Sequence, residues 1–202
     1  MSGRSSRVVL ATRNKHKILE LERILAPYDI ALASPSDLPD VAETGATFAE
    51  NALLKARAIA AVTGLVAIAD DSGLEVDALN GMPGVLSARW AGVHGDDRAN
   101  LSLVLAQIAD VPDERRTAAF VCAAAAVAPS GAEIVVEGRV DGVLLRSPRG
   151  TGGFGYDPIF VPLGSTQTTA EMTAEEKDAL SHRGKAFRAL APRLTGLLDT
   201  VQ

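Results

Sequence analysis

The sequence predicts a mixed α/β fold, in which helices and strands alternate early and a β-hairpin dominates the middle. Some apolar residues recur with a helical period, whereas other apolar runs are continuous, as in buried strands. Pro129-Ser130-Gly131 separates two such runs and predicts the hairpin. A hairpin beside alternating helices and strands indicates a mixed sheet rather than a purely parallel one.

The first part of the chain alternates between the two kinds of element. Residues 7–12 form an apolar run typical of a short strand, and residues 14–25 carry an amphipathic helical pattern. A polar loop containing proline covers residues 34–45. A Thr-x-x-Glu capping box then opens a helix over residues 47–63, and the apolar run 65–69 predicts a buried strand.

The second part combines the hairpin with three more helices. Residues 97–108 have a helical period, and residues 117–128 and 133–145 are the predicted hairpin strands. A second capping box, Thr173 to Glu176, precedes a short helix, and residues 186–198 close the chain helically.

Composition limits the class of protein. The 202 residues suit one domain, predicted over residues 1–202 with residues 1–6 flexible. The formal charge of −5 argues against a broad nucleic-acid surface, which needs clustered Lys and Arg. No apolar signal region begins the chain, and no segment approaches the ~20 apolar residues of a membrane span, so a cytoplasmic location without a membrane partner is expected. Cys122 is the single cysteine and is expected to be a core thiol.

Asp70-Asp71-Ser72-Gly73 follows the predicted strand 65–69 and is the most informative motif. Carboxylates are rarely buried without a partner, because their desolvation is expensive. A metal ion is one such partner, and strand ends are where sheet proteins place ligands. The motif therefore predicts a functional site at the end of the strand, the alternative being a turn that merely ends it.

Two further clusters carry charge. Thr12-Arg13-Asn14-Lys15-His16-Lys17 lies at a strand-to-helix turn, where free backbone N–H groups favour anions. It lacks the glycine pattern of a P-loop, and the alternative is a simple capped helix. Glu43-Thr44-Gly45 offers a carboxylate, with a solvated loop acid as the alternative.

The segment 150–158 holds four glycines and two aromatic residues. An aromatic ring on a flexible backbone suits base stacking, the alternative being a turn pinned by a core Phe. Further along, His182 and Arg183 offer donors for a carbonyl or a phosphate, unless they belong to a charged helix junction. Four of the five lysines fall in two basic clusters, residues 12–17 and 175–185: Lys15, Lys17, Lys177 and Lys185.

In their order and residue identities, these motifs closely resemble those of the inosine/xanthosine triphosphate pyrophosphatases, which remove deaminated purine nucleotides. The matching motifs are Thr12-x-Asn14-x-x-Lys17-x-x-Glu20, Glu43-Thr44-Gly45, Ala69-Asp70-Asp71-Ser72-Gly73-Leu74, Gly152-Gly153-Phe154-Gly155-Tyr156-Asp157-Pro158 and Ser181-His182-Arg183. The resemblance covers about residues 7–198. The Asp-Asp-Ser-Gly and Phe-Gly-Tyr-Asp motifs together are highly specific.

The resemblance implies an elongated, two-lobed α/β fold with a central nucleotide cleft, a homodimer and dependence on Mg²⁺. It implies hydrolysis of ITP, dITP and XTP at the α–β bond to the monophosphate and pyrophosphate, which cleanses the nucleotide pool.

The resemblance also implies roles for single residues. Asp71 corresponds to the general base and a metal ligand, and Glu43 to the second metal carboxylate. The residues implied to contact the nucleotide, mainly its phosphates, are Thr12, Arg13, Asn14, Lys15, His16, Lys17, Ser72 and Lys177. Those implied to surround the sugar and base are Phe154, Gly155, Tyr156, Asp157, His182 and Arg183. Three positions depart from the family pattern: Arg13 replaces a common glycine, Trp90 a tyrosine and Asp178 an asparagine.

Physical chemistry supports these roles. A nucleoside triphosphate carries about four negative charges near pH 7. A chain of charge −5 needs local positive charge to bind it, and Lys17, Lys177, Arg183 and Mg²⁺ would supply it. Glu43 and Asp71 are the one or two carboxylates that Mg²⁺ prefers beside phosphate oxygens. Two alternatives stay open: a pyrophosphatase for other modified nucleotides, and a non-catalytic nucleotide-binding sensor.

Overall fold

The structure is a computed structural model that describes residues 7–12, 14–28, 30–33 and 38–199. Residues 1–6, which the sequence predicts to be flexible, lie outside this range, as does Arg13. The strands are β1 (Arg7–Leu10), β2 (Ala31–Ala33), β3 (Val66–Val76), β4 (Thr117–Val127), β5 (Glu133–Leu144) and β6 (Phe160–Pro162). The α-helices are α1 (Lys15–Leu25), α2 (Phe48–Thr63), α3 (Asp97–Gln107), α4 (Ala174–Leu180) and α5 (His182–Asp199).

The strands form one six-stranded sheet in the order β2-β1-β3-β4-β5-β6. Strand β1 pairs in parallel with both β2 and β3, whereas β6 pairs antiparallel with β5. The mixed α/β fold predicted from the sequence is therefore confirmed. Among the described helices, none combines the length and hydropathy of a membrane span.

The chain contacts divide the protein into two units. Unit 1 runs up to Asp71 and includes Cys122–Gly138 and the chain from Arg183 onward, and unit 2 comprises Ser72–Val121 and Arg139–His182. The boundaries fall within β3, β4 and β5 and at the start of α5, so these elements each contribute residues to both units.

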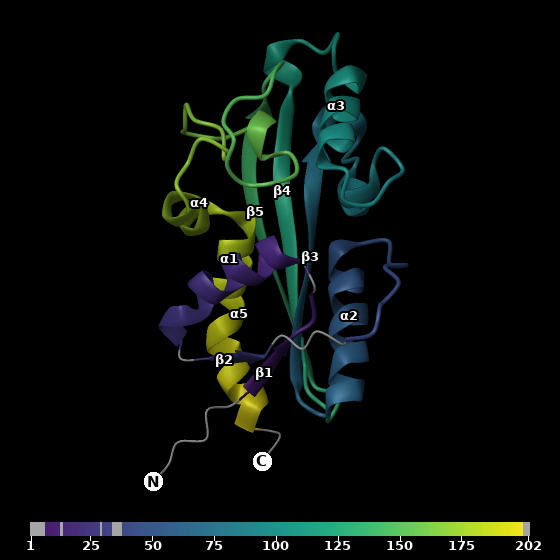
Figure 1. Ribbon diagram of the computed structural model, residues 1–202, viewed down its shortest axis with the longest axis vertical. Helices are drawn as coiled ribbons and strands as arrows, with labels where there is room; N and C mark the ends of the chain where they lie inside the picture. Colours follow the sequence, from purple (N-terminus) through teal and green to yellow (C-terminus); the bar gives the residue numbers. More distant parts are fainter. Residues whose placement is uncertain (1–6, 13, 29, 34–37, 200–202) are drawn as a thin grey trace. The chain divides into compact units, whose positions relative to one another are not determined.

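Unit 1 is built around its strands, with α1 and α5 on one side and α2 on the other (Figure 1). Leu21 of α1 and Phe187 of α5 share one apolar cluster with Val8 of β1 and Ile68 of β3. Helix α2 begins at the predicted place, because the Thr47 hydroxyl accepts a hydrogen bond from the Glu50 N–H.

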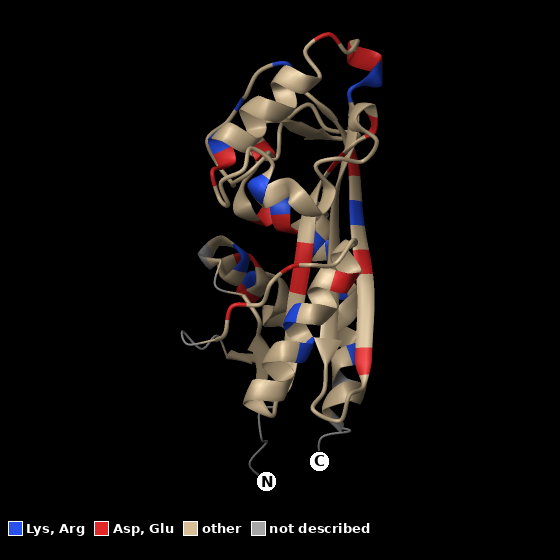
Figure 2. Ribbon diagram, turned by 90° about the vertical axis from the view of Figure 1, so that its right-hand side faces the viewer, with Lys and Arg blue, Asp and Glu red and all other residues tan. Residues whose placement is uncertain are grey.

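Unit 2 has an apolar cluster of its own. Leu74 of β3, Leu101 and Val104 of α3, and Phe160 of β6 are among its buried members. Each unit therefore buries its own core. In the view of Figure 2, basic and acidic residues are interspersed along the ribbon.

The structure corrects two predicted boundaries. Strand β3 does not end before Asp70 but continues to Val76, so the Asp-Asp-Ser-Gly motif lies inside a strand and is not a turn. The reason is that Leu74 and Val76 are fully buried and extend the apolar side of the strand. Helix α5 begins at His182, earlier than predicted, so that residue and Arg183 lie in its first turn.

Candidate functional site

The alternation of side chains along β3 separates two adjacent carboxylates. Consecutive residues of a strand point to opposite faces. Asp70 contacts Lys17 of α1 and Arg183 of α5, whereas Asp71 contacts Asn51 and Lys55 of α2. One strand therefore presents a carboxylate to each face of the sheet in unit 1.

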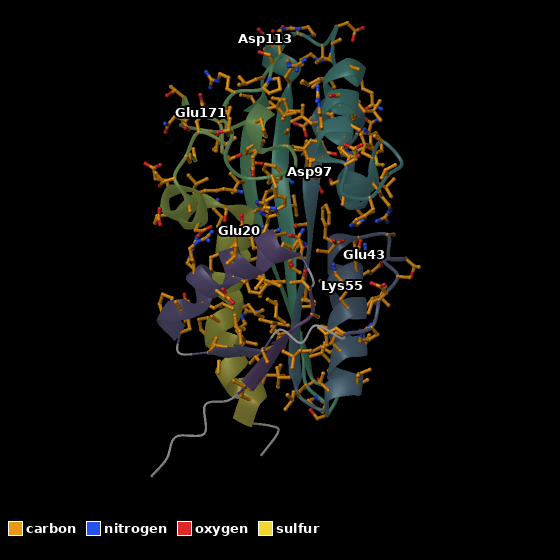
Figure 3. All side chains as sticks on the ribbon, in the orientation of Figure 1. Glu20, Glu43, Lys55, Asp97, Asp113 and Glu171 are labelled. Carbon is orange, nitrogen blue, oxygen red and sulfur yellow. The ribbon has the colours of Figure 1, made fainter. Side chains whose placement is uncertain are left out.

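Asp71 lies in a polar cluster with residues of α2 and the preceding loop. Its Oδ2 accepts a hydrogen bond from Asn51 Nδ2 at 3.0 Å, and its Oδ1 is 3.5 Å from Lys55 Nζ. Lys55 Nζ is also 2.8 Å from Glu43 Oε1, and both labelled side chains can be followed in Figure 3. Glu43 and Asp71, the two predicted metal ligands, thus meet at the same ammonium group.

The charges of this cluster shift its pKa values. Burial raises the pKa of Asp71, as does the neighbouring Glu43, while Lys55 opposes the rise. Burial acts to lower the pKa of Lys55, but the carboxylates of Asp71, Asp70 and Glu43 outweigh it, so that the pKa is raised. The ammonium group therefore stays charged near neutral pH and balances the carboxylates.

The donor set of this cluster fits a hard divalent cation. Two carboxylates already converge on one positive charge, and Mg²⁺ commonly takes one or two carboxylates together with waters and phosphate oxygens. Within the described residues there is no group of three or more His, Cys, Asp or Glu side chains arranged for a metal. A cation bound by Glu43 and Asp71 would therefore share them with Lys55.

Asp70 is the centre of a second, buried charge cluster. Its Oδ2 lies 2.9 Å from Lys17 Nζ and 3.2 Å from Arg183 Nε. Arg183 also pairs with Glu20 through Nη1. Burial acts to raise the pKa of Asp70, but the positive charges of Lys17 and Arg183 outweigh it and hold the pKa well below its usual range. Asp70 therefore joins two residues predicted to contact different parts of a nucleotide.

The start of α1 is a capped helix. Asn14 Oδ1 accepts hydrogen bonds from the N–H groups of His16 and Lys17, and Thr12 Oγ1 accepts from the Asn14 N–H. These amides are thus already bonded within the chain. Of the predicted cluster 12–17, Arg13 lies outside the described residues, as does the side chain of Lys15.

In unit 2, the glycine-rich segment is organised by Asp157, whose side chain is buried. Asp157 Oδ2 accepts from the Phe154 N–H at 2.8 Å and from Lys177 Nζ at 2.7 Å, while Oδ1 accepts from Thr169 Oγ1 at 2.8 Å. A Cβ on Gly153 would lie 2.1 Å from Asp157 Oδ2, so only glycine fits there.

Phe154 is half-buried, and Lys177 Nζ lies 5.0 Å from the centre of its ring. This is the range of a cation–π contact. Lys177, which the resemblance assigns mainly to the phosphates, therefore lies in unit 2 beside Phe154 and Asp157.

The remaining predicted residues of unit 2 are fixed in different ways. The Gly155 N–H donates to Asp97 Oδ2 at 2.8 Å, and the Tyr156 hydroxyl donates to the Ser87 carbonyl at 2.9 Å. The His182 ring stacks on Phe120, with ring centres 4.9 Å apart. Ser72 is half-buried on β3, directly after Asp71.

Lys55 and Asn51 were not predicted from the sequence, although both reach Asp71. The available signal is their spacing, because residues four apart on a helix share one face. Both follow the predicted capping box at Thr47, so a helix presenting an amide and an ammonium group to one side could have been inferred.

Comparisons with known proteins show which family the chain resembles over nearly its whole length. A model of the Ham1 family matches residues 8–193. A protein of Streptomyces coelicolor named dITP/XTP pyrophosphatase is 63% identical over 198 residues, which cover 96% of this chain and 99% of that protein. A namesake from Mycobacteroides abscessus is 57% identical over 199 residues, covering 96% of this chain and 97% of that protein.

Solved structures are similar as well. A nucleoside-triphosphatase (dITP/XTP pyrophosphatase) from Mycobacterium abscessus has a TM-score of 0.76 and 59% identity, covering 92% of this chain and 99% of its own. A HAM1 protein from Coxiella burnetii has a TM-score of 0.86 and 41% identity, covering 94% of this chain and 98% of its own.

Proposed function

This chain belongs to the Ham1 family, and we propose that it hydrolyses ITP, dITP and XTP between the α- and β-phosphates, releasing the monophosphate and pyrophosphate. The observation that carries this proposal is the cluster at Asp71, in which the carboxylates of Asp71 and Glu43 converge on the ammonium group of Lys55. The relatives named dITP/XTP pyrophosphatase support the substrate class.

In this proposal Asp71 accepts the proton of the attacking water, while its carboxylate is held by Asn51 and Lys55. Glu43 and Asp71 would hold Mg²⁺, which polarises the α-phosphate and lowers the pKa of a bound water. Lys17 would contribute charge toward the phosphates. The carboxylates argue against a non-catalytic sensor, because without a metal ion they would repel a triphosphate.

Phe154 is proposed to stack on the purine, with Gly155, Tyr156 and Asp157 forming its backbone support. His182 and Arg183 are proposed to donate to the 6-oxygen, which inosine and xanthosine carry where adenosine has an amino group. An amino group in place of the 6-oxygen would face these donors without accepting a hydrogen bond from them, and such a mismatch can reject a substrate by roughly 10²–10⁴ or more.

The experiment that tests the function is a screen of nucleoside triphosphates with and without Mg²⁺, in which both products are identified. Inosine monophosphate and pyrophosphate are expected from ITP, and ATP is expected to react far more slowly. Release of orthophosphate with a diphosphate left behind would contradict cleavage at the α–β bond. Faster turnover of modified pyrimidine triphosphates would favour the related pyrophosphatase instead.

The base-reading assignment has its own test in the same assay. The ratio of kcat/KM for ITP to kcat/KM for ATP should fall in His182→Ala or Arg183→Ala. Phe154→Ala should instead lower kcat/KM for all purine nucleotides alike, because stacking does not distinguish the groups on the base edge. If the ratio stays constant in both donor variants, other residues recognise the 6-oxygen. A homodimer and a cytoplasmic location are further parts of the proposal, and light scattering of the purified chain tests the first.

A further inference from the structure

The backbone of the glycine-rich segment is held by two carboxylates that come from different parts of the sequence. The consecutive N–H groups of Phe154 and Gly155 donate to Asp157 and Asp97, respectively, each at 2.8 Å. Asp157 belongs to the segment itself. Asp97 is the first residue of α3, 58 positions away from Gly155, and is labelled in Figure 3.

The helix does not need Asp97 for its own cap. Asp96 occupies the N-cap position of α3, and its Oδ1 accepts from the Ala99 N–H at 3.0 Å. The carboxylate of Asp97 instead binds Gly155. Burial raises the pKa of Tyr156, as does the nearby charge of Asp97.

The segment needs such an external contact because its own backbone is permissive. Gly153 and Gly155 have φ values of +70° and +62°, in the left-handed region that glycine enters without strain. A backbone of this kind loses more conformational freedom on ordering than any other. A charge-assisted hydrogen bond at Gly155 restricts the peptide that directly follows Phe154.

We propose that Asp97 is a positioning residue for base binding: by accepting the Gly155 N–H, it holds the Phe154 ring in the orientation that stacks on the purine. This inference rests on the proposed function, in which Phe154 is the stacking residue. Asp97 itself has no contact with substrate in this proposal.

The test compares Asp97→Ala with Asp96→Ala, which removes the cap of the same helix but not the contact to Gly155. Asp97→Ala should raise KM for ITP about tenfold, the factor for about 1.4 kcal/mol. It should leave kcat nearly unchanged, because binding in the ground state and in the transition state is weakened alike. Inhibition by inorganic tripolyphosphate, which has no base, should not change. Asp97→Asn retains an oxygen acceptor and should recover part of the loss.

Asp96→Ala should lower the melting temperature and leave KM unaltered. An equal rise of KM in both variants would overturn the inference, because it would reflect a weakened helix rather than the contact to Gly155. An unchanged KM in Asp97→Ala would overturn it too. So would a loss of inhibition by tripolyphosphate as large as the rise in KM for ITP.

A double-mutant cycle separates this inference from the proposed function. In a Phe154→Ala background, Asp97→Ala should add less than about a twofold rise in KM, since coupled residues are not additive. If Phe154→Ala raises KM and Asp97→Ala does not, only the inference fails. If Phe154→Ala itself leaves KM unchanged, the stacking role fails and the inference fails with it.

Discussion

Asp71 offers the most direct test of the proposed chemistry at the scale of single residues. Asp71→Asn keeps the side-chain volume but removes a proton acceptor and a metal ligand. Turnover of ITP should fall by at least roughly 10²–10⁴, the range for loss of a general base. Circular dichroism should show an intact fold. Asp141→Asn, an exposed substitution on β5, is the control. A loss smaller than about tenfold would remove Asp71 from the catalytic role.

The position of Lys55 predicts that its ammonium group competes with Mg²⁺ for the same two carboxylates. Its ammonium group contacts both Glu43 and Asp71, so Lys55→Met should let these carboxylates bind Mg²⁺ more tightly in the absence of nucleotide. Titration calorimetry should show a gain of about tenfold in affinity, equivalent to about 1.4 kcal/mol.

The matched control is Arg57→Met, which removes another cation of α2 that pairs with Glu133. Its affinity for Mg²⁺ should equal that of the unaltered protein. Unchanged or weaker binding in Lys55→Met would show that the lysine does not occupy the place of a metal ion.

The family resemblance carried by the motifs assigned roles to Glu43, Asp71 and Phe154, and these roles stay predictions. The sequence did not reveal that Lys55 joins the first two, because Lys55 lies outside the two basic clusters that hold the other four lysines. A side chain's long-range partner depends on how two elements pack, and local pattern carries no record of that.

At the scale of elements, hydrogen bonds from Arg116 link the end of α3 to the end of β5. Its guanidinium donates to the carbonyls of Leu144, Ile108 and Leu145 at 2.6–2.9 Å, and only 2% of the residue is exposed. Burial lowers its pKa, as does the nearby charge of Arg146. Arg116→Met would leave buried carbonyls unsatisfied and should cost roughly 2–5 kcal/mol of unfolding free energy.

Chemical denaturation measures this cost, and Arg146→Met is its control. Arg146 also donates to two carbonyls near the end of α3, those of Ala109 and Val111, but it is exposed. Its loss should cost no more than roughly 1 kcal/mol, as for an exposed ion pair. If both variants lowered the free energy of unfolding equally, burial would not explain how Arg116 stabilises the fold.

Most elements were predictable because their patterns were long. The helix of 47–63, the helix of 97–108 and both hairpin strands were found nearly where the structure has them. Strands β2 and β6 were not predicted, since each has only three residues and so little periodicity. The length of β3 was underestimated because two charged residues interrupt its apolar run, although their partners allow them to be buried.

At the scale of the whole molecule, removal of metal should stop turnover without unfolding the chain. Each unit buries an apolar cluster of its own, so folding does not depend on ligation as it does in a zinc finger. EDTA should abolish ITP hydrolysis, and excess Mg²⁺ should restore it. The melting temperature should shift by no more than about 4 °C, the change that about 1 kcal/mol produces in a domain of this size. Full activity in EDTA would contradict the proposed cofactor.

The boundaries between the two units could not be located from residue patterns. The sequence shows no linker, and the boundaries fall inside strands and at the start of a helix, where composition does not change. The family resemblance implied two lobes, but no local signal marked Asp71 and Ser72 as the last and first residues of different units.

The alternation along β3 has a consequence for the gene. Loss of one codon between Val66 and Ala69 would exchange the faces of the two carboxylates that follow, so each would lose its partners at once. Loss of one codon at Pro129-Ser130-Gly131 would change the turn between β4 and β5 but not the faces to which the two carboxylates of β3 point. Related genes should therefore vary in length at the turn, while the number of codons from Val66 to Asp71 stays constant.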